Sequence, residues 1–145
     1  MGKKLGPDQH KAWAYFITRH SKVFGRIERA LEDKEGLLPL HLYDILLALK
    51  NASNKKLRLS DISDQIVTSR SALSRSVDKL ELLDLLKKEK APEDGRGQFA
   101  EITAKGLKAL SETWPHYEAA IQEYFGRHLN SNDSRKMIEI LNKLD

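Results

Sequence analysis

Hydrophobic residues at helical spacing open the chain. Between Asp8 and Gly36 they recur at intervals of three, four or seven positions, at Trp13, Phe16, Ile17, Phe24, Ile27 and Leu31. This period predicts one long amphipathic helix, which Pro7 and Asp8 can start and Gly36 can end. A second, more apolar segment begins near Pro39 and stops at residues 51–54, which predicts a helix that is buried on most sides.

Shorter elements follow in the middle of the chain. Residues 57–59 alternate like a very short strand, and Ser60 is expected to cap a helix over residues 61–66. A turn at residues 67–68 leads to another helix over about residues 69–83, with Leu73, Val77 and Leu80 as its buried stripe. Two short helices joined by a tight turn form the helix-turn-helix pattern.

A hairpin and two helices are predicted for the rest of the chain. Residues 85–90 and 98–102 have strand patterns, and residues 91–97 between them contain two glycines and a proline. We expect this hairpin to form a wing. Thr103 can cap a long helix that ends near Gly126, and a last helix is expected to be capped near Ser131.

Composition narrows the class of protein. The chain has 145 residues, of which 40% are hydrophobic, enough for one core. It has no cysteine, which excludes disulfides and thiolate metal sites and fits a reducing cytoplasm. No apolar run has the length of a signal peptide or a membrane span, so we expect a cytoplasmic protein with no membrane partner.

Charge permits binding to a polyanion but does not establish it. The net charge is +4, from 25 basic and 21 acidic residues, so the positions of the basic side chains must decide. Hydroxyl and basic side chains occupy the outer face of the predicted helix over residues 69–83, at Ser69, Arg70, Ser71, Ser74, Arg75 and Lys79. A helix fits the major groove of double-stranded DNA, and its first turns face the base edges.

These residue types suit DNA recognition. Arg70 or Arg75 can hold a guanine in a bidentate contact, and the serines and Lys79 suit phosphate oxygens. A solvated polar face explains the same residues when this helix is considered alone. The predicted wing adds Arg96, which can enter a minor groove, and Asp94, which can orient Arg96 by an ion pair. Lys88 and Lys90 are further wing candidates, and incidental charge on a solvated turn is the alternative.

Four segments resemble the MarR family of multiple-antibiotic-resistance regulators in order and spacing: residues 59–63, 68–81, 94–97 and 102–106. The wing signature of that family falls on Asp94, Arg96, Ile102, Thr103 and Gly106, with isoleucine in place of leucine at position 102. Two further departures are Asp84, where the family usually has glycine, and Val67, where a small residue is common.

The resemblance implies a mainly α fold with a small β wing, a winged helix-turn-helix with long N- and C-terminal dimerisation helices. We expect a single domain over residues 1–145, with a helical dimerisation region (8–35 and 104–145) and a winged DNA-binding region (37–103). A homodimer would place two recognition helices on a palindromic operator, and repression is the family's commoner mode. The outer helices are consistent with a dimer, because they carry many bulky apolar residues: Trp13, Phe16, Phe24, Trp114, Tyr117, Tyr124, Phe125 and Met137. A monomer with a self-contained helical layer is the alternative.

Relatives commonly release DNA when a small aromatic molecule binds between the dimer helices and the winged region. Trp13, His20, His41 and Tyr43 are candidates to line such an effector pocket, although aromatic residues at helical spacing are more often core. Such an effector acts only if it binds one conformation of the dimer better than the other.

Other functions find little support. The five histidines form no HxxxH pair and have no cysteine beside them, so no metal or other cofactor is expected. Ser76 and Lys79 match the spacing of a serine acyl-transfer motif whose other parts are missing, so the chain is not expected to be an enzyme. The alternative in another class is a winged-helix module for protein contact, which the acidic residues Asp78, Glu81, Glu93 and Asp94 favour because they dilute the positive charge.

Overall fold

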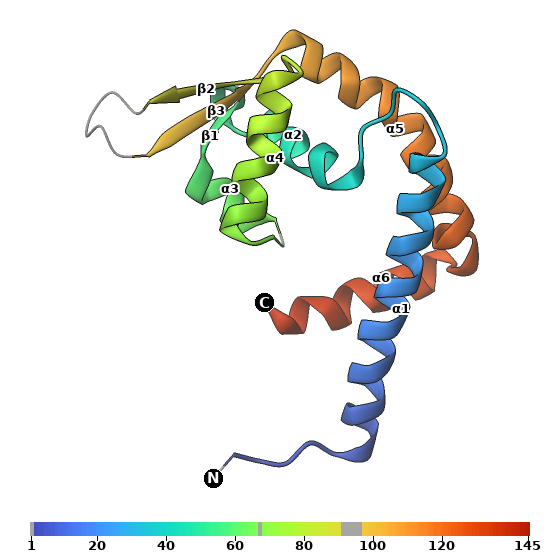
Figure 1. Ribbon diagram of the computed structural model, residues 1–145. Helices are drawn as coiled ribbons and strands as arrows, with labels where there is room; N and C mark the ends of the chain where they lie inside the picture. The colour runs from blue at the N-terminus through green and yellow to red at the C-terminus, as the bar shows by residue number, and fades with distance from the viewer. Residues whose placement is uncertain (1, 67, 91–96) are drawn as a thin grey trace. The chain divides into compact units, whose positions relative to one another are not determined.

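Two units make up the computed structural model, which describes residues 2–66, 68–90 and 97–145 (Figure 1). The winged unit comprises residues 34–116, and the helical unit comprises residues 1–33 together with 117–145. Each unit is described by itself below. Among the described residues, no helix has both the length and the apolar character needed to span a bilayer.

The winged unit contains a three-stranded sheet among short helices. In chain order it comprises α2 (Leu40–Asn51), η1 (Ser53–Lys55), β1 (Lys56–Arg58), α3 (Leu59–Gln65), α4 (Arg70–Leu82), β2 (Leu86–Lys90), β3 (Gln98–Ile102) and the first part of α5 (Ala104–Tyr124). The strands are antiparallel in the order β1-β3-β2, with Leu57 opposite Ala100 and Leu86 opposite Ile102. Figure 1 shows the β2–β3 hairpin extending away from α2, α3 and α4. The predicted fold class, mainly α with a small β wing, is confirmed.

The core of the winged unit draws on helices and strands alike. The described side chains that are at most 1% exposed include Leu46 and Leu49 from α2, Ile62 from α3, Val77 and Leu80 from α4, and Leu86 and Ala100 from the sheet. The buried stripe predicted for α4 is therefore confirmed, since Leu73 is also buried. This packing leaves the opposite face of α4 in contact with solvent.

One predicted helix cap was wrong by two residues, and the cap predicted near Ser131 is confirmed. The helix α3 begins at Leu59, and the extended residue before it is Arg58, so Ser60 lies inside the helix and caps nothing. The reason is that β1 pairs with β3 as far as Arg58, and the chain turns into the helix at the next residue. The helix α6 (Ser131–Leu141) is capped by Asn130, whose Oδ1 accepts a hydrogen bond from the Asp133 N–H (2.8 Å).

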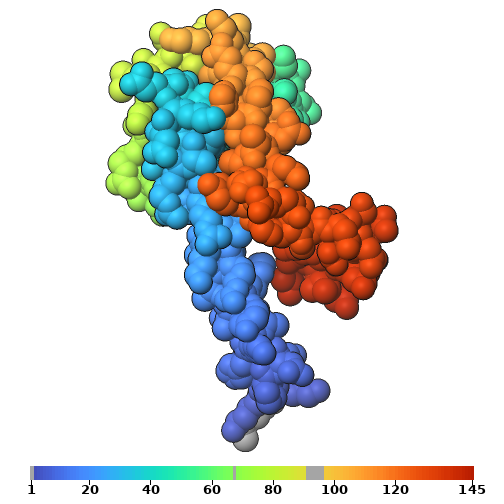
Figure 2. Space-filling view, turned by 90° about the vertical axis from the view of Figure 1, so that its right-hand side faces the viewer, coloured from blue at the N-terminus to red at the C-terminus, as the bar shows by residue number. Residues whose placement is uncertain are grey.

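The helical unit contains α1 (Pro7–Glu32), the end of α5, η2 (Gly126–His128), α6 and η3 (Asn142–Leu144). Residues 7–22 of α1 are exposed throughout. On the face seen in Figure 2, no other segment of the helical unit covers the first half of α1, drawn in blue. The exposed side chains of this unit include Trp13 (62%), Ile140 (60%) and Leu144 (73%). The apolar side chains of α6 and of the first half of α1 are therefore left largely uncovered.

Candidate nucleic-acid interface

The helix α4 exposes hydroxyl and basic side chains to solvent. Ser69 caps it, because the Ser69 Oγ accepts a hydrogen bond from the Ala72 N–H (3.2 Å). The six candidate residues predicted on this helix are all exposed: Ser69, Arg70, Ser71, Ser74, Arg75 and Lys79. Ser71, Ser74 and Arg75 follow one another at helical spacing, so they share one face. The structure thus exposes all six predicted α4 residues and places Ser71, Ser74 and Arg75 on one face, whereas Arg70 and Lys79 lie on different sides of the helix.

Two acidic residues of α4 are paired with the wing. The Lys88 Nζ of β2 donates a hydrogen bond to Asp78 Oδ1 (2.6 Å) and lies 3.7 Å from Glu81 Oε1. The Lys88 backbone N–H donates to Glu81 Oε2 (2.9 Å). The hydrogen bond to Asp78, with the charges of Asp78 and Glu81, raises the pKa of Lys88, against the opposing effect of its partial burial. One ammonium therefore faces two carboxylates, so this cluster keeps a formal net charge of −1 and Lys88 compensates only part of the negative charge beside α4.

The predicted wing candidates fall into two groups. Asp94 and Arg96 lie outside the described residues, and their roles stay predictions. Lys90 is exposed at the end of β2, where it pairs across the ladder with Gln98. Lys88 is less accessible, with 23% of its side chain exposed, and it is occupied by the two carboxylates.

Arg58 is a basic residue of the wing that the sequence reasoning did not include. Its guanidinium carbon lies 5.0 Å from the centroid of the Phe99 ring, its pairing partner on β3. A cation over an aromatic face is held in place by electrostatic attraction. The alternation at residues 57–59 was the available signal, because it places Arg58 on the side of the sheet opposite its neighbours.

The corner between α4 and β2 fixes where the helix ends and the wing begins. Asp84 adopts a left-handed conformation (φ 60°). The Leu85 N–H donates to the Leu80 carbonyl (2.9 Å) and the Asp84 N–H to the Glu81 carbonyl (3.0 Å). This is the Schellman arrangement, whose left-handed position favours glycine. The glycine usual in the family is therefore explained, and aspartate occupies the same conformation here.

Gly106 closes the same corner from the side of α5. A Cβ at this position would lie 2.2 Å from the Leu85 carbonyl oxygen and 2.7 Å from Ile102 Cγ1. The Thr103 Oγ1 accepts from the Gly106 N–H (3.0 Å) and donates to the Asp84 carbonyl (2.7 Å). Thr103 thus caps α5, as predicted, and also ties that helix to the end of α4.

The four residues predicted to line an effector pocket belong to different units. Trp13 and His20 are exposed on α1, where the His20 ring stacks on Phe24 with 5.7 Å between centroids. In the winged unit, His41 is exposed on α2 and Tyr43 is only 4% exposed. Their shared role in one pocket stays a prediction.

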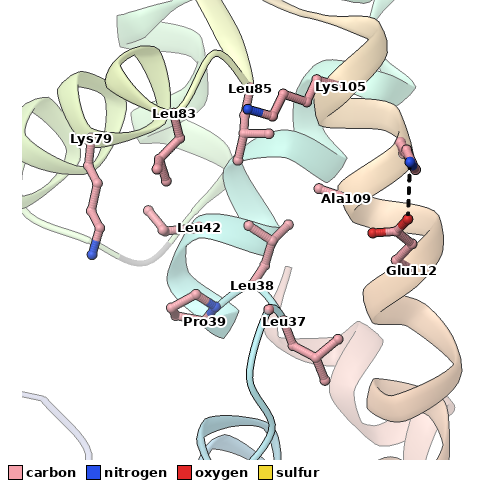
Figure 3. A pocket seen from close by; sticks show the side chains of 12 residues that line it. Leu37, Leu38, Pro39, Leu42, Lys79, Leu83, Leu85, Lys105, Ala109 and Glu112 are labelled. Carbon is pink, nitrogen blue, oxygen red and sulfur yellow. Dashed lines mark ion pairs between the residues drawn. The ribbon is translucent and has the colours of Figure 1, made fainter.

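A cavity of about 440 Å³ lies within the winged unit, next to the last turn of α4. Figure 3 shows the side chains of Leu42, Leu83 and Leu85 pointing into the space between α4 and α5. Lys79, Lys105 and Lys108 are also among its lining residues, and Lys108 pairs with Glu112 of the same lining (3.7 Å). The cavity therefore combines apolar side chains with an excess of basic ones. Among the described residues, no group of three or more histidine, aspartate or glutamate side chains is placed to hold a metal ion.

Comparison with known proteins bears on this site. The MarR family model matches residues 36–97. The HTH-type transcriptional regulator MhqR of Bacillus subtilis is 32% identical over 108 residues, which cover 70% of this chain and 72% of MhqR.

Solved structures are similar over nearly the whole chain. Sco3205, a MarR family transcriptional regulator from Streptomyces coelicolor solved in complex with DNA, is 25% identical with a TM-score of 0.85, covering 99% of this chain and 89% of that one. Bordetella bronchiseptica BpsR, whose DNA binding is regulated by 6-hydroxynicotinic acid, has the same fold at 18% identity and a TM-score of 0.79, covering 92% of this chain and 98% of BpsR. The fold, the match over the winged region and the similarity to MhqR together show that this chain belongs to the MarR family, whose members are transcription regulators and not enzymes.

Proposed function

We propose that this chain is a sequence-specific regulator that binds double-stranded DNA as a homodimer, with α4 in the major groove. The observation that carries the proposal is the exposure of six hydroxyl and basic side chains at the start and along α4, directly before the β2–β3 hairpin. Arg70 and Arg75 read guanine in this proposal, and the serines and Lys79 bind phosphates. On the wing, Arg96 enters the minor groove and Asp94 orients it. Lys90 and Arg58 lie close to the phosphate backbone of the DNA.

The wing and the acidic residues of α4 also bear on the rival function, a winged-helix module for protein contact. The alternative of a protein-contact module rested on carboxylates that dilute the positive charge around α4. Lys88 compensates one of the two carboxylate charges of Asp78 and Glu81 next to α4. These carboxylates consequently repel a polyanion less than two free carboxylates would.

The proposed dimer divides the chain between two tasks. The winged region (37–103) contacts DNA, and the outer helices (8–35 and 104–145) join two copies of the chain. Support comes from the apolar side chains that the helical unit leaves exposed, among them Trp13, Ile140 and Leu144. Apolar surface of this extent on helices is typical of an interface. A two-fold dimer places two α4 helices on a palindromic operator, and occupation of that operator represses transcription.

An effector completes the proposal. We propose that an aromatic acid enters the cavity of the winged unit, with its ring against Leu42 and Leu85 and its carboxylate beside Lys79 or Lys105. Lys79 would then serve both the effector and DNA, which would make their binding mutually exclusive. The regulation of BpsR by 6-hydroxynicotinic acid offers a precedent of the same chemical class. Trp13, His20, His41 and Tyr43 remain the alternative pocket residues.

The experiment is a binding assay with DNA fragments that the wild-type chain selects from a random library, at two salt concentrations. The Arg70→Ala/Arg75→Ala variant should lose at least about 2 kcal/mol of specific binding energy, or about 30-fold in affinity. The Lys50→Ala/Lys55→Ala variant, which removes two charges from the end of α2 and from η1, is the matched control and should lose much less. Equal losses in both variants, or no selected fragment, would contradict the proposal.

A further inference from the structure

Lys88 is held by two side chains of α4 at once. Its Nζ hydrogen bonds to Asp78 Oδ1 at 2.6 Å and lies 3.7 Å from Glu81 Oε1, while its backbone N–H donates to Glu81 Oε2 at 2.9 Å. A charge-assisted hydrogen bond of this length is among the stronger polar contacts in proteins. Only 23% of the Lys88 side chain is exposed, so water screens this cluster less than the Lys108–Glu112 pair, with 74% and 58% exposed.

The backbone contact has a second consequence. The strand β2 is at the edge of the sheet, because the strand order is β1-β3-β2. On its outer edge β2 has no strand to pair with, so a backbone N–H on that side needs a partner outside the sheet. The Lys88 N–H finds this partner in Glu81 of α4. The helix and the wing are consequently joined through a main-chain atom, which leaves little freedom in the distance between them.

The position of Asp78 on α4 matters equally. Asp78 follows Ser71 by seven residues, Ser74 by four and Arg75 by three, so it lies on the face proposed to meet DNA. A free carboxylate there would repel phosphates. The ammonium of Lys88, on β2, compensates this charge through its hydrogen bond to Asp78 Oδ1.

We infer that Lys88 is a positioning residue that fixes the β2–β3 hairpin against α4 and compensates the charge of Asp78, in place of the direct DNA contact predicted from the sequence. The inference rests on the proposed function, because its consequence is the spacing of two elements that would enter adjacent grooves. In this arrangement Lys88 acts on DNA only through its partners on α4.

A double-mutant cycle separates positioning from contact. The variants are Lys88→Met, which keeps the aliphatic stem, Asp78→Asn, and the two together, with Lys87→Met as the control on the other face of β2. Specific and non-specific affinity are measured at several salt concentrations with fragments selected by the wild-type chain. Thermal unfolding of each variant shows that it folds.

The expected result is a loss of about tenfold or more in specific affinity for Lys88→Met, with non-specific affinity much less affected. Adding Asp78→Asn should restore the part of this loss that comes from the uncompensated Asp78 carboxylate, while the part that comes from the loosened hairpin should remain. Lys87→Met should cost less than about threefold and gain nothing from Asp78→Asn.

Two outcomes would overturn the inference about Lys88 and leave the proposed function standing. Lys88→Met could leave specific affinity unchanged in a chain that selects DNA normally. Alternatively, Lys88→Met could lower the salt dependence by about one counterion with no rescue by Asp78→Asn, which is the behaviour of a phosphate contact. A wild-type chain that selects no fragment would instead overturn the proposed function first, before any variant is compared.

Discussion

The two units of this protein differ in how they treat their apolar side chains. In the winged unit, residues from α2, α3, α4, β2 and β3 enclose a core in which Leu46, Ile62 and Val77 are completely buried. In the helical unit, the described hydrophobic residues that are buried are only Ile27, Leu31 and Ala120, and most large apolar side chains of α1 and α6 face outward.

This difference indicates which of the two units encloses its own hydrophobic core. Burial of apolar surface is the main favourable term in folding, so a unit that encloses its core can stand by itself. A unit with its apolar faces exposed requires a second surface to cover them. The comparison therefore supports the proposed division, in which the winged unit is self-sufficient and the helical unit is completed by another copy of the chain.

The largest expected effect comes from a charge placed on the uncovered helices. Ile140→Asp, on α6, should weaken self-association by at least about 3 kcal/mol, or two orders of magnitude, because the carboxylate would have to be buried at the interface. Sedimentation velocity over a range of concentrations measures this. Leu82→Asp, at an 85% exposed site of the winged unit, is the matched control and should leave the oligomeric state unchanged. An unchanged oligomeric state of the Ile140→Asp variant would contradict the claim that the helical unit is completed by another copy of the chain.

A methyl group at Gly106 tests the close packing of the winged unit. Gly106→Ala should lower the free energy of unfolding by about 2 to 3 kcal/mol, because its Cβ would collide with the Leu85 carbonyl, a backbone atom that cannot rotate away. Chemical denaturation provides the measurement. In Gly25→Ala the added methyl meets only the mobile end of Arg29, so this control should be neutral or stabilising. Equal behaviour of the two variants would contradict the close approach of α5 to β2.

A smaller effect is expected at the corner after α4. Asp84→Gly should raise the free energy of unfolding by up to about 1 kcal/mol, because glycine adopts the left-handed conformation of this residue at lower cost. The same denaturation assay applies, with Asp64→Gly inside α3 as a control that should destabilise. A loss of stability in Asp84→Gly would show that the aspartate side chain itself holds the corner.

The smallest effect concerns a carboxylate half enclosed by the winged unit. Burial raises the pKa of Asp44 above its ordinary value of 3.8, although the charge of His41 acts in the opposite direction. The folded chain then binds this proton more tightly than the unfolded chain, so stability falls as the pH rises from about 4 through the raised pKa. Asp44→Asn should therefore be more stable than the wild type at neutral pH, and the difference should vanish below about pH 4. A difference that stays constant across this range would exclude the linkage.

Much of the fold followed from periodicity. Leu73, Val77 and Leu80 recur at helical spacing, and the same spacing defined which residues of α4 would be exposed. The glycines and proline before β3 marked the hairpin, and the resemblance of residues 59–106 to one family pointed to its order of elements. These signals are local, so a single sequence carries them.

The features that sequence reasoning missed depend on contacts between elements. Nothing near Lys88 indicates that Asp78 and Glu81 will bind it, because the partners meet only when β2 packs beside α4. Arg58 was overlooked for the same reason, since its position over Phe99 requires the pairing of β1 with β3. One cap position was also displaced: Ser60 is a good cap by residue type, but Arg58 holds the capping position of α3.

The central claim is that one dimer presents two winged units to one face of DNA. Hydroxyl-radical footprinting of the wild-type chain on a fragment selected from a random library tests it most directly. We predict two symmetric protected patches whose centres are separated by one helical turn, about 10 base pairs, or a whole multiple of it. A single protected patch, or two patches on opposite faces of the duplex, would contradict the account.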